Sequence, residues 1–347
     1  MDLTEKLALV KEVGEEIVTE EELKVLLETN EHPTAYDGFE PSGMAHLPFG
    51  VYRAINLKKM TKAGVRFKLL LADWYAWINN KMGGDLEKIR KVGDYFLEVW
   101  KAAGVPMNEV EVLWSSEIMD KDYWKTAIEI AKNHSLQRTM RAMTIAGREG
   151  TLESPAAWVF YPSMQVADIF HLNVDICQLG KDQRRANMLA REIAPKIGKK
   201  KPVAVHHHML MGLHAKSENE KMSKSEPATS IYVHDAETEI LSKIQKAYCP
   251  EKQARDNPVL DYAKHIIFKS FDSMEIERES KYGGDITFHS YPELEQIYES
   301  GALHPSDLKR GVAKQLNLLV KPIREHFEKT RKARELYEFV RRQEITR

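Results

Sequence analysis

The first part of the chain alternates short apolar runs with longer segments in which apolar residues recur every three or four positions. The short runs have the length of strands. They predict strands at Thr34 to Phe39, Arg66 to Ala72, Val110 to Trp114, Val174 to Gln178 and Val203 to His207. Because helical patterns separate these runs, the order is typical of an α/β fold with a mostly parallel sheet.

The helical segments are marked by their apolar spacing and by their ends. Helical patterns cover residues 51–63, 85–103, 118–150 and 182–194. Pro162 predicts the start of another helix that runs to about His171, because proline suits a first turn. Near the N-terminus, residues 3–29 predict short amphipathic helices, with Thr19 and Glu22 placed as a capping box.

The character of the sequence changes near residue 235. Helical patterns dominate beyond this point, and the run Tyr282-Gly283-Gly284-Asp285 predicts a β or turn element that interrupts them. We therefore expect an α/β domain over residues 1–235 and a mostly α-helical domain over residues 236–347.

Composition narrows the class of protein. The chain has 347 residues, of which 43% are hydrophobic and 30% charged, so an unfolded or low-complexity chain is excluded. No apolar run is long enough to predict a membrane span, and the first residues lack the apolar core of a signal peptide. Cys177 and Cys249 lie far apart, which argues against a disulfide framework and against a cysteine zinc site. These features predict a reducing, cytoplasmic compartment.

Charge is unevenly distributed along the chain. The formal net charge is −1, yet residues 308–347 carry 12 lysines and arginines against 5 glutamates. A basic segment on an otherwise acidic chain fits a partner that bears phosphate groups. It also fits a solvated helix with unbalanced charge, and composition alone leaves both interpretations open.

Two segments have the composition of phosphate-binding loops. Residues 40–50 (EPSGMAHLPFG) lie between a predicted strand and a predicted helix, where open α/β sheets bind ligands. Small residues allow a ligand to approach, the helix N-terminus offers N–H groups, and His46 is a further donor. Residues 221–225 (KMSKS) combine two cations with two hydroxyl groups. Each segment alone also fits an ordinary turn or a solvated loop.

A third segment places polar residues on a helix that is otherwise apolar. Tyr161, Gln165 and Asp168 are spaced by four and three residues, so they share one face. Buried Gln and Asp side chains need partners. Those partners are either an internal hydrogen-bond network or a polar ligand, and the spacing alone does not decide between them.

Several motifs occur together in a recognisable order: AYDGFEPSG (35–43), ADWYAW (72–77), YPSMQVAD (161–168), GKDQRR (180–185), KMSKS (221–225), AYCP (247–250), YGGD (282–285) and LHPSDLK (303–309). In this order the chain resembles the tyrosyl-tRNA synthetases of the archaeal and eukaryotic type, which are class I aminoacyl-tRNA synthetases. The resemblance covers nearly the whole chain. One signature departs from the family pattern, because His46-Leu47-Pro48-Phe49-Gly50 stands where His-x-Gly-His is common.

The resemblance implies a Rossmann-like, doubly wound parallel sheet with a helical connective insertion at about 118–158 and a KMSKS loop at about 214–234. It implies a helical anticodon-binding domain over residues 236–347. It further implies a homodimer, with the insertion contributing to dimerisation.

The implied reaction is a ligation in two steps: ATP and L-tyrosine give tyrosyl-adenylate and pyrophosphate, and the tyrosyl group then passes to the 3′-terminal ribose of tRNA(Tyr). The resemblance assigns Tyr36 and Asp168 to the phenol of the substrate, because a phenol is both a donor and an acceptor. It assigns Tyr161, Gln165 and Gln183 to the α-ammonium group.

The remaining implied residues bind ATP and tRNA. For ATP, accompanied by Mg²⁺, they are Gly38, Ser42, Gly43, His46, Lys221, Met222, Ser223, Lys224 and Ser225. Of these, His46, Lys221 and Lys224 would neutralise charge during catalysis. For tRNA, Arg184 matches a position that reads the acceptor stem, and Tyr282 and Asp307 match positions that read the anticodon.

Two other functions remain as alternatives. A tryptophanyl-tRNA synthetase shares fold and motifs, although an indole N–H is only a donor and fits the Tyr36 and Asp168 pair less well. A catalytically weak paralogue that binds tRNA is the second. We expect no metal site, because the run of histidines at 206–208 alternates between faces of a strand and has no acidic or cysteine partner at ligand spacing.

Overall fold

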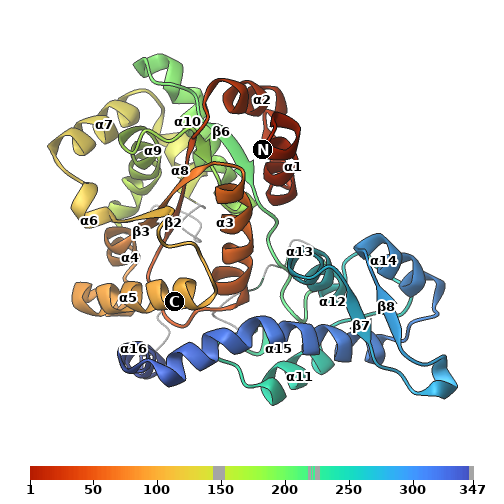
Figure 1. Cartoon of the computed structure of the whole chain (residues 1–347). Helices are drawn as coiled ribbons and strands as arrows, with labels where there is room; N and C mark the ends of the chain where they lie inside the picture. The colour runs from red at the N-terminus through yellow and green to blue at the C-terminus, as the bar shows by residue number, and fades with distance from the viewer. Residues whose placement is uncertain (144–152, 218–219, 221, 223–226, 344–347) are drawn as a thin grey trace.

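The computed structural model describes the chain except residues 144–152, 218–219, 221, 223–226 and 344–347. Six strands form one sheet in the order β1-β6-β5-β2-β3-β4, and Figure 1 shows it flanked by helices. The strands are β1 (Glu16–Val18), β2 (Thr34–Phe39), β3 (Arg66–Leu71), β4 (Val110–Trp114), β5 (Ile176–Cys177) and β6 (Val203–His206). No helix in the described part of the chain is long and apolar enough to cross a membrane.

The predicted strands are confirmed, with corrections at four places. β2 and β4 have the predicted bounds, whereas β5 is limited to Ile176–Cys177. β3 ends at Leu71 and β6 at His206, each one residue earlier than predicted. The N-terminal segment is not wholly helical, because β1 pairs antiparallel with β6 along the edge of the otherwise parallel sheet. Three residues are too few for a period to show in the sequence.

Helices cover both faces of the sheet. They are α1 (Leu3–Val13), α2 (Glu20–Thr29), α3 (Arg53–Lys62), α4 (Asp73–Ile78), α5 (Leu86–Ala102), α6 (Ser115–Ile118), α7 (Lys121–Lys132), α8 (Leu136–Ala142), α9 (Tyr161–His171) and α10 (Arg184–Ile193). Short helical turns are η1 (Pro48–Tyr52), η2 (Lys81–Gly84), η4 (Ala156–Val159), η5 (Lys181–Gln183), η6 (Ala194–Ile197) and η7 (Pro227–Thr229). The predicted helices at 85–103 and 162–171 are therefore confirmed. Thr19 caps α2 by accepting a hydrogen bond from the Glu22 N–H at 3.2 Å.

Alternation along the strands divides the core into two clusters. In β3, Phe67 and Leu69 belong to the cluster with α3 and α5, whereas Leu70 belongs to the cluster with α7, α9 and α10. In β2, Ala35 and Tyr36 divide in the same way. Since successive side chains of a strand point to opposite faces, both faces are buried and the fold is doubly wound.

The C-terminal part is mainly helical. It contains α11 (Glu237–Lys246), α12 (Pro258–Tyr262), η8 (Ala263–Ile267), α13 (Phe268–Ser270), β7 (Met274–Ile276), η9 (Ser280–Tyr282), β8 (Ile286–Phe288), α14 (Tyr291–Ser300), α15 (Pro305–Lys329) and α16 (Arg331–Arg341). β7 and β8 form a hairpin, which confirms the element predicted near residues 282–285. Helix α15 packs on α11, and α16 packs against α5 of the first part (Figure 1).

The segment that contains His46 is paired with a distant stretch of chain. The N–H of Leu47 donates to the carbonyl of Ile231 at 2.8 Å, and the N–H of Val233 donates to the carbonyl of Ala45 at 3.1 Å. Just beyond, the backbone of Gly50 lies so close to Val233 that a Cβ on Gly50 would be 2.5 Å from Val233 Cγ1. This pairing brings the end of the KMSKS region to the loop after β2.

Replacing Gly50 with alanine tests this close approach. We expect Gly50→Ala to lower the free energy of unfolding by about 1–3 kcal/mol, because an added methyl group overpacks the contact. Val233→Ala removes the opposing methyl groups, so the double variant should be more stable than the two single losses predict. Urea unfolding of the four proteins measures this coupling, and strictly additive losses would contradict the contact.

Candidate active site

A cavity of about 280 Å³ opens at the carboxyl ends of β2 and β5. These two strands are parallel neighbours, and the order in which strands are added to the sheet reverses between them. β3 and β4 are added on the far side of β2, whereas β6 is added on the far side of β5. Ligands of open α/β sheets bind at such a point. The cavity brings together Gly38, His46, Gln183 and Met222 among the predicted residues.

A buried ion pair forms one wall of this cavity. Arg53 donates from Nη1 to Oδ2 of Asp37 at 2.7 Å, and its other terminal nitrogen is hydrogen-bonded to Oε1 of Gln178. Both charged side chains are almost fully buried. Burial raises the pKa of Asp37 to about 7, although Arg53 opposes the shift. The pair therefore holds the end of β2 to η1–α3 and to β5.

A second, deeper site surrounds the carboxylate of Asp168 in α9. Tyr75 donates a hydrogen bond to one of its oxygens at 2.6 Å, and Tyr123 donates to the other at 2.7 Å. Burial raises the pKa of Asp168 to about 7, and the two hydroxyl groups oppose that shift. The side chain is 2% exposed. A carboxylate so enclosed is held in one orientation by its two donors.

Two polar atoms near this carboxylate have no partner among the described residues. The hydroxyl of Tyr36 is fully buried in the same cluster of side chains as Asp168, Tyr75 and Tyr123, and it makes no hydrogen bond. Oε1 of Gln165 is also unpaired, while its Nε2 donates to Oε1 of Gln183 at 3.1 Å. Because an unpaired buried polar atom costs roughly 1–3 kcal/mol, these atoms point to a polar ligand.

Tyr161 lies at the boundary between the two sites. Its hydroxyl donates to Oε1 of Glu40 at 2.6 Å, and that oxygen also accepts from Nδ2 of Asn79 at 2.6 Å. The ring of Tyr161 meets the ring of Tyr75 edge-on, with centroids 4.7 Å apart. The polar ends of Tyr161 and Glu40 therefore connect the deep site to the cavity that Glu40 lines.

Comparison with known proteins identifies the family. The model for "tRNA synthetases class I (W and Y)" matches residues 28–321. The chain belongs to this family of class I tRNA synthetases. The resemblance and the fold class predicted from the sequence are thereby confirmed.

Individual relatives place it on the tyrosyl side of the family. It is 48% identical to tyrosine–tRNA ligase 1, cytoplasmic, of Arabidopsis thaliana, over 100% of this chain and 90% of that protein. A tyrosine–tRNA ligase of Sulfurisphaera tokodaii is 44% identical, with 94% of both chains covered. The structure of tyrosyl-tRNA synthetase from Pyrococcus horikoshii complexed with L-tyrosine matches with a TM-score of 0.91 and 40% identity, over 98% of this chain and 100% of that chain.

Of the residues assigned to ATP, Gly38 and Met222 line the same cavity as His46, and the others do not share this described position. Ser42 and Gly43 lie in the loop after β2, where Gly43 has a φ of 111°, and they are not among the residues that line the cavity. Met222 is buried, and its N–H donates to the carbonyl of Leu210 at 2.8 Å. Lys221, Ser223, Lys224 and Ser225 lie outside the described residues.

The residues assigned to tRNA lie on three separate elements of the structure. Arg184 begins α10 and donates from Nε to both oxygens of Glu16 at 2.9 Å. Tyr282 is 60% exposed in the connection between β7 and β8, with the ammonium of Lys281 4.8 Å from its ring centre. Asp307 is buried in the first turn of α15 and is paired with Arg310. The ring of Tyr282 is thus accessible to a stacking partner, while the carboxylate of Asp307 already forms an ion pair with Arg310.

Sequence reasoning missed two members of the deep site. Tyr123 comes from α7 in the helical insertion, and no local spacing relates it to Asp168, which lies 45 residues away. Glu40 belongs to the motif EPSG, yet its role as the acceptor for Tyr161 requires the fold. Tyr75 lies in the ADWYAW motif, and in the structure its hydroxyl donates a hydrogen bond to Asp168.

The buried ion pair gives a stability test of the site. We expect Arg53→Met to lower the free energy of unfolding by about 3–5 kcal/mol, because Asp37 is left buried without its partner. Asp37→Asn combined with Arg53→Met removes both charges and should recover part of that loss. Arg66→Met, at an exposed position, is the control and should change stability by less than about 0.5 kcal/mol. Equal losses for the single and double variants in urea unfolding would show that the pair is not the cause.

Proposed function

We propose that this synthetase joins L-tyrosine to tRNA(Tyr), through tyrosyl-adenylate formed from tyrosine and ATP with release of pyrophosphate. The observation that carries the proposal is the buried carboxylate of Asp168 beside the unpaired hydroxyl of Tyr36. Its named relatives and the solved structure with tyrosine support the same amino acid.

The deep site has the hydrogen-bonding pattern that a phenol requires. Asp168 accepts the phenol O–H, and the Tyr36 hydroxyl donates to the phenol oxygen. Tyr75 and Tyr123 keep the carboxylate in place without exhausting it, because each carboxylate oxygen accepts more than one hydrogen bond. A phenylalanine side chain would leave Asp168 and Tyr36 without these bonds, at a cost in a dry site.

The other end of the amino acid meets oxygen acceptors. Gln165 offers its unpaired Oε1, and the oxygens of Tyr161 and Gln183 lie along the same path toward the cavity. Three neutral acceptors suit an ammonium group, and they leave the carboxylate of the substrate facing the cavity below His46. This arrangement presents the carboxylate to the α-phosphorus of ATP.

We assign ATP to the cavity at the ends of β2 and β5, with Mg²⁺ entering as part of the ATP complex. Gly38 allows close approach of the nucleotide, and His46 offers a hydrogen-bond donor to phosphate. Lys221 and Lys224 of KMSKS would neutralise charge on the leaving pyrophosphate as it develops. No nucleophilic side chain is needed, because the substrate carboxylate is the nucleophile.

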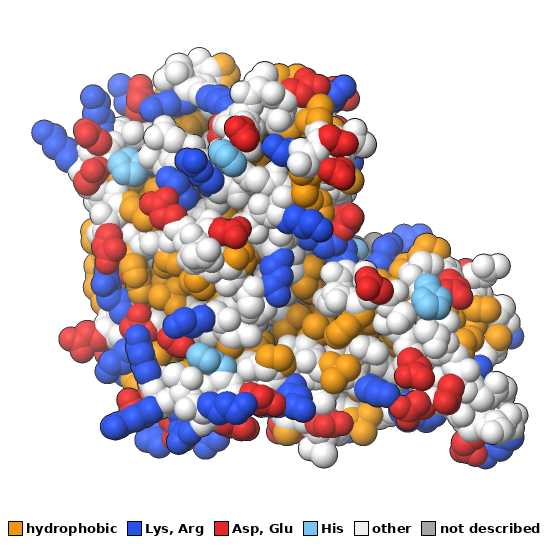
Figure 2. Space-filling model, in the orientation of Figure 1, with side chains coloured by type: hydrophobic (Ala, Val, Ile, Leu, Met, Phe, Trp, Pro, Cys, Tyr) orange, Lys and Arg blue, Asp and Glu red, His pale blue; other side chains and the backbone are white. Residues whose placement is uncertain are grey.

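We assign the reaction, including transfer to tRNA, to a catalytic domain over residues 1–235. We assign binding of the anticodon to residues 236–347. Arg184 reads the acceptor stem, and Tyr282 stacks on an anticodon base. Asp307 releases its ion pair with Arg310 and accepts hydrogen bonds from the edge of a base. Figure 2 shows lysine and arginine side chains exposed over the end of the molecule where α16 lies, which fits contact with phosphates.

We also propose a homodimer in the cytoplasm. The insertion and the turn that follows it expose large apolar side chains, with Ile128 60%, Leu136 66% and Phe160 58% exposed. Apolar groups gathered on one part of a surface indicate an interface. The cytoplasmic assignment follows the name of the Arabidopsis relative and the free state of both cysteines.

Amino-acid-dependent exchange of pyrophosphate into ATP tests the function. With each of the twenty amino acids and no tRNA, we expect exchange with tyrosine alone, because only a phenol satisfies both Asp168 and Tyr36. Exchange with tryptophan would favour the tryptophanyl alternative. Absence of exchange from folded protein would favour a paralogue that binds tRNA without activating an amino acid, in keeping with the altered signature at residues 46–50.

The pKa of Asp168 predicts a pH dependence for tyrosine. Protonated Asp168 no longer accepts the phenol O–H, so kcat/KM for tyrosine should fall as pH drops through about 7. Tyr75→Phe keeps the ring but removes a hydrogen bond that lowers the pKa of Asp168, so the fall should move to higher pH. Profiles of kcat/KM for ATP serve as the control and should coincide for the two proteins. A shift to lower pH in Tyr75→Phe would contradict this assignment of the titrating group.

A further inference from the structure

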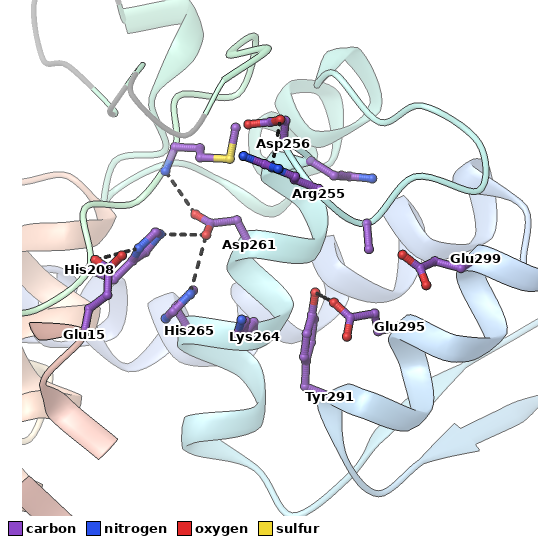
Figure 3. A pocket seen from close by; sticks show the side chains of 13 residues that line it. Glu15, His208, Arg255, Asp256, Asp261, Lys264, His265, Tyr291, Glu295 and Glu299 are labelled. Carbon is purple, nitrogen blue, oxygen red and sulfur yellow. Dashed lines mark hydrogen bonds and ion pairs between the residues drawn. The ribbon is translucent and has the colours of Figure 1, made fainter. Parts of the chain in front are cut away.

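Two histidines and an aspartate from separate parts of the chain meet beside a second cavity (Figure 3). His208 follows β6, whereas Asp261 lies in α12 and His265 in η8. Nε2 of His208 is 2.7 Å from Oδ1 of Asp261, and Nε2 of His265 is 3.7 Å from the same oxygen. One ligand atom from each residue lies within 4.8 Å of the others.

An ion pair between His208 and Asp261 does not explain why the ring of His265 is buried beside them. The two imidazole rings are stacked, with centroids 3.9 Å apart, and Nε2 of His265 is too far from Asp261 for a hydrogen bond. Nδ1 of His265 is buried and has no partner among the described residues.

The surroundings hold the other two groups in orientations that suit a cation. Oδ2 of Asp261 accepts from the N–H of Met211 at 3.0 Å, which leaves Oδ1 facing both histidines. Nδ1 of His208 lies 3.4 Å from Oε2 of Glu15, so a carboxylate supports the ring from behind. Metal-binding histidines commonly have such a carboxylate on the second ring nitrogen.

The adjoining cavity gives an ion a path to the cluster. Its volume is about 410 Å³, and it is lined by more acidic than basic side chains: Glu15, Asp256, Asp261, Glu295 and Glu299 against Arg255 and Lys264. Figure 3 shows His208, Asp261 and His265 converging at one side of this space. The acidic lining favours entry of a cation.

We infer that His208, Asp261 and His265 form a binding site for one divalent transition-metal ion of the zinc type, with water completing the coordination. Two imidazoles and one carboxylate are a ligand set that zinc and cobalt accept. A metal about 2.0–2.2 Å from each ligand separates them by roughly 3.3 Å in a tetrahedral site, between the two distances observed here. Because the two imidazole rings are stacked in the structure, each would have to turn for both lone pairs to point at one ion.

This site would join parts of the chain that lie on either side of the KMSKS region. His208 and Met211 belong to the segment that leads from β6 toward KMSKS, and Asp261 and His265 belong to the helices that follow it. From the sequence we expected no metal site, because no acidic or cysteine partner lies near residues 206–208. Asp261 is 53 residues from His208 and comes close to it only in the fold. The inference revises that expectation and stands independently of the proposed reaction.

Metal titration of the full-length chain tests the site. After removal of metal with a chelator, we expect calorimetry to show one Zn²⁺ bound per chain, with a Kd of about 1 µM or tighter. Co²⁺ should bind with the same stoichiometry and show the intense visible absorption of a tetrahedral site. His265→Phe keeps an aromatic ring in the stack but removes a ligand, and should weaken binding at least about 10-fold. Exposed His289→Phe is the matched control and should bind as the wild type does.

Two results would overturn the inference. One is a wild-type chain that binds no stoichiometric Zn²⁺ although its thermal melting shows it to be folded. The other is His265→Phe binding with wild-type affinity, which would place the ion elsewhere. If His265→Phe does not fold, Asp261→Asn takes its place, with the same loss expected and folding checked by melting in chelator.

Discussion

The buried carboxylate of Asp168 is the group on which the rest of this site depends. It comes from α9, and its donors come from α4 and α7, so three helices must pack on one another before the carboxylate has partners. A carboxylate without those hydroxyl groups would stay protonated in so dry a position. The helical insertion therefore contributes Tyr123 to the deep site as well as connecting the two halves of the sheet.

The cavity that His46 lines depends on backbone pairing between segments far apart in the sequence. Residues 45–47 pair with residues 231–233, and the hydroxyl of Tyr95 accepts from the N–H of Ala45 at 3.2 Å. His234 is stacked between Tyr95 and Tyr337, which places α16 on the same structure. The C-terminal helices thus contact the segment that carries His46 through two aromatic rings. These contacts connect α16 to the loop that carries His46.

The sequence was sufficient for elements with strong periodicity and insufficient for contacts between distant segments. The alternation in β2 and β3 and the apolar stripe of α5 predicted their positions closely, because local pattern determines them. β1 is too short to show a pattern. The YPSMQVAD motif indicated a polar face on α9. Only the fold showed that Tyr123 and Tyr75 donate hydrogen bonds to Asp168 and that the hydroxyl of Tyr36 remains unpaired. The sequence did not show Asp261 as the partner of His208, because the two residues are 53 positions apart and meet only in the fold.

Direct binding of the free amino acid tests the central claim that a phenol is read by Asp168 and Tyr36. Calorimetric titration of the chain with L-tyrosine and with L-phenylalanine, in the absence of ATP and tRNA, isolates this recognition from the later steps. We expect tyrosine to bind at least about 100-fold more tightly than phenylalanine, because phenylalanine leaves two buried groups without partners. Equal affinities for the two amino acids would contradict it.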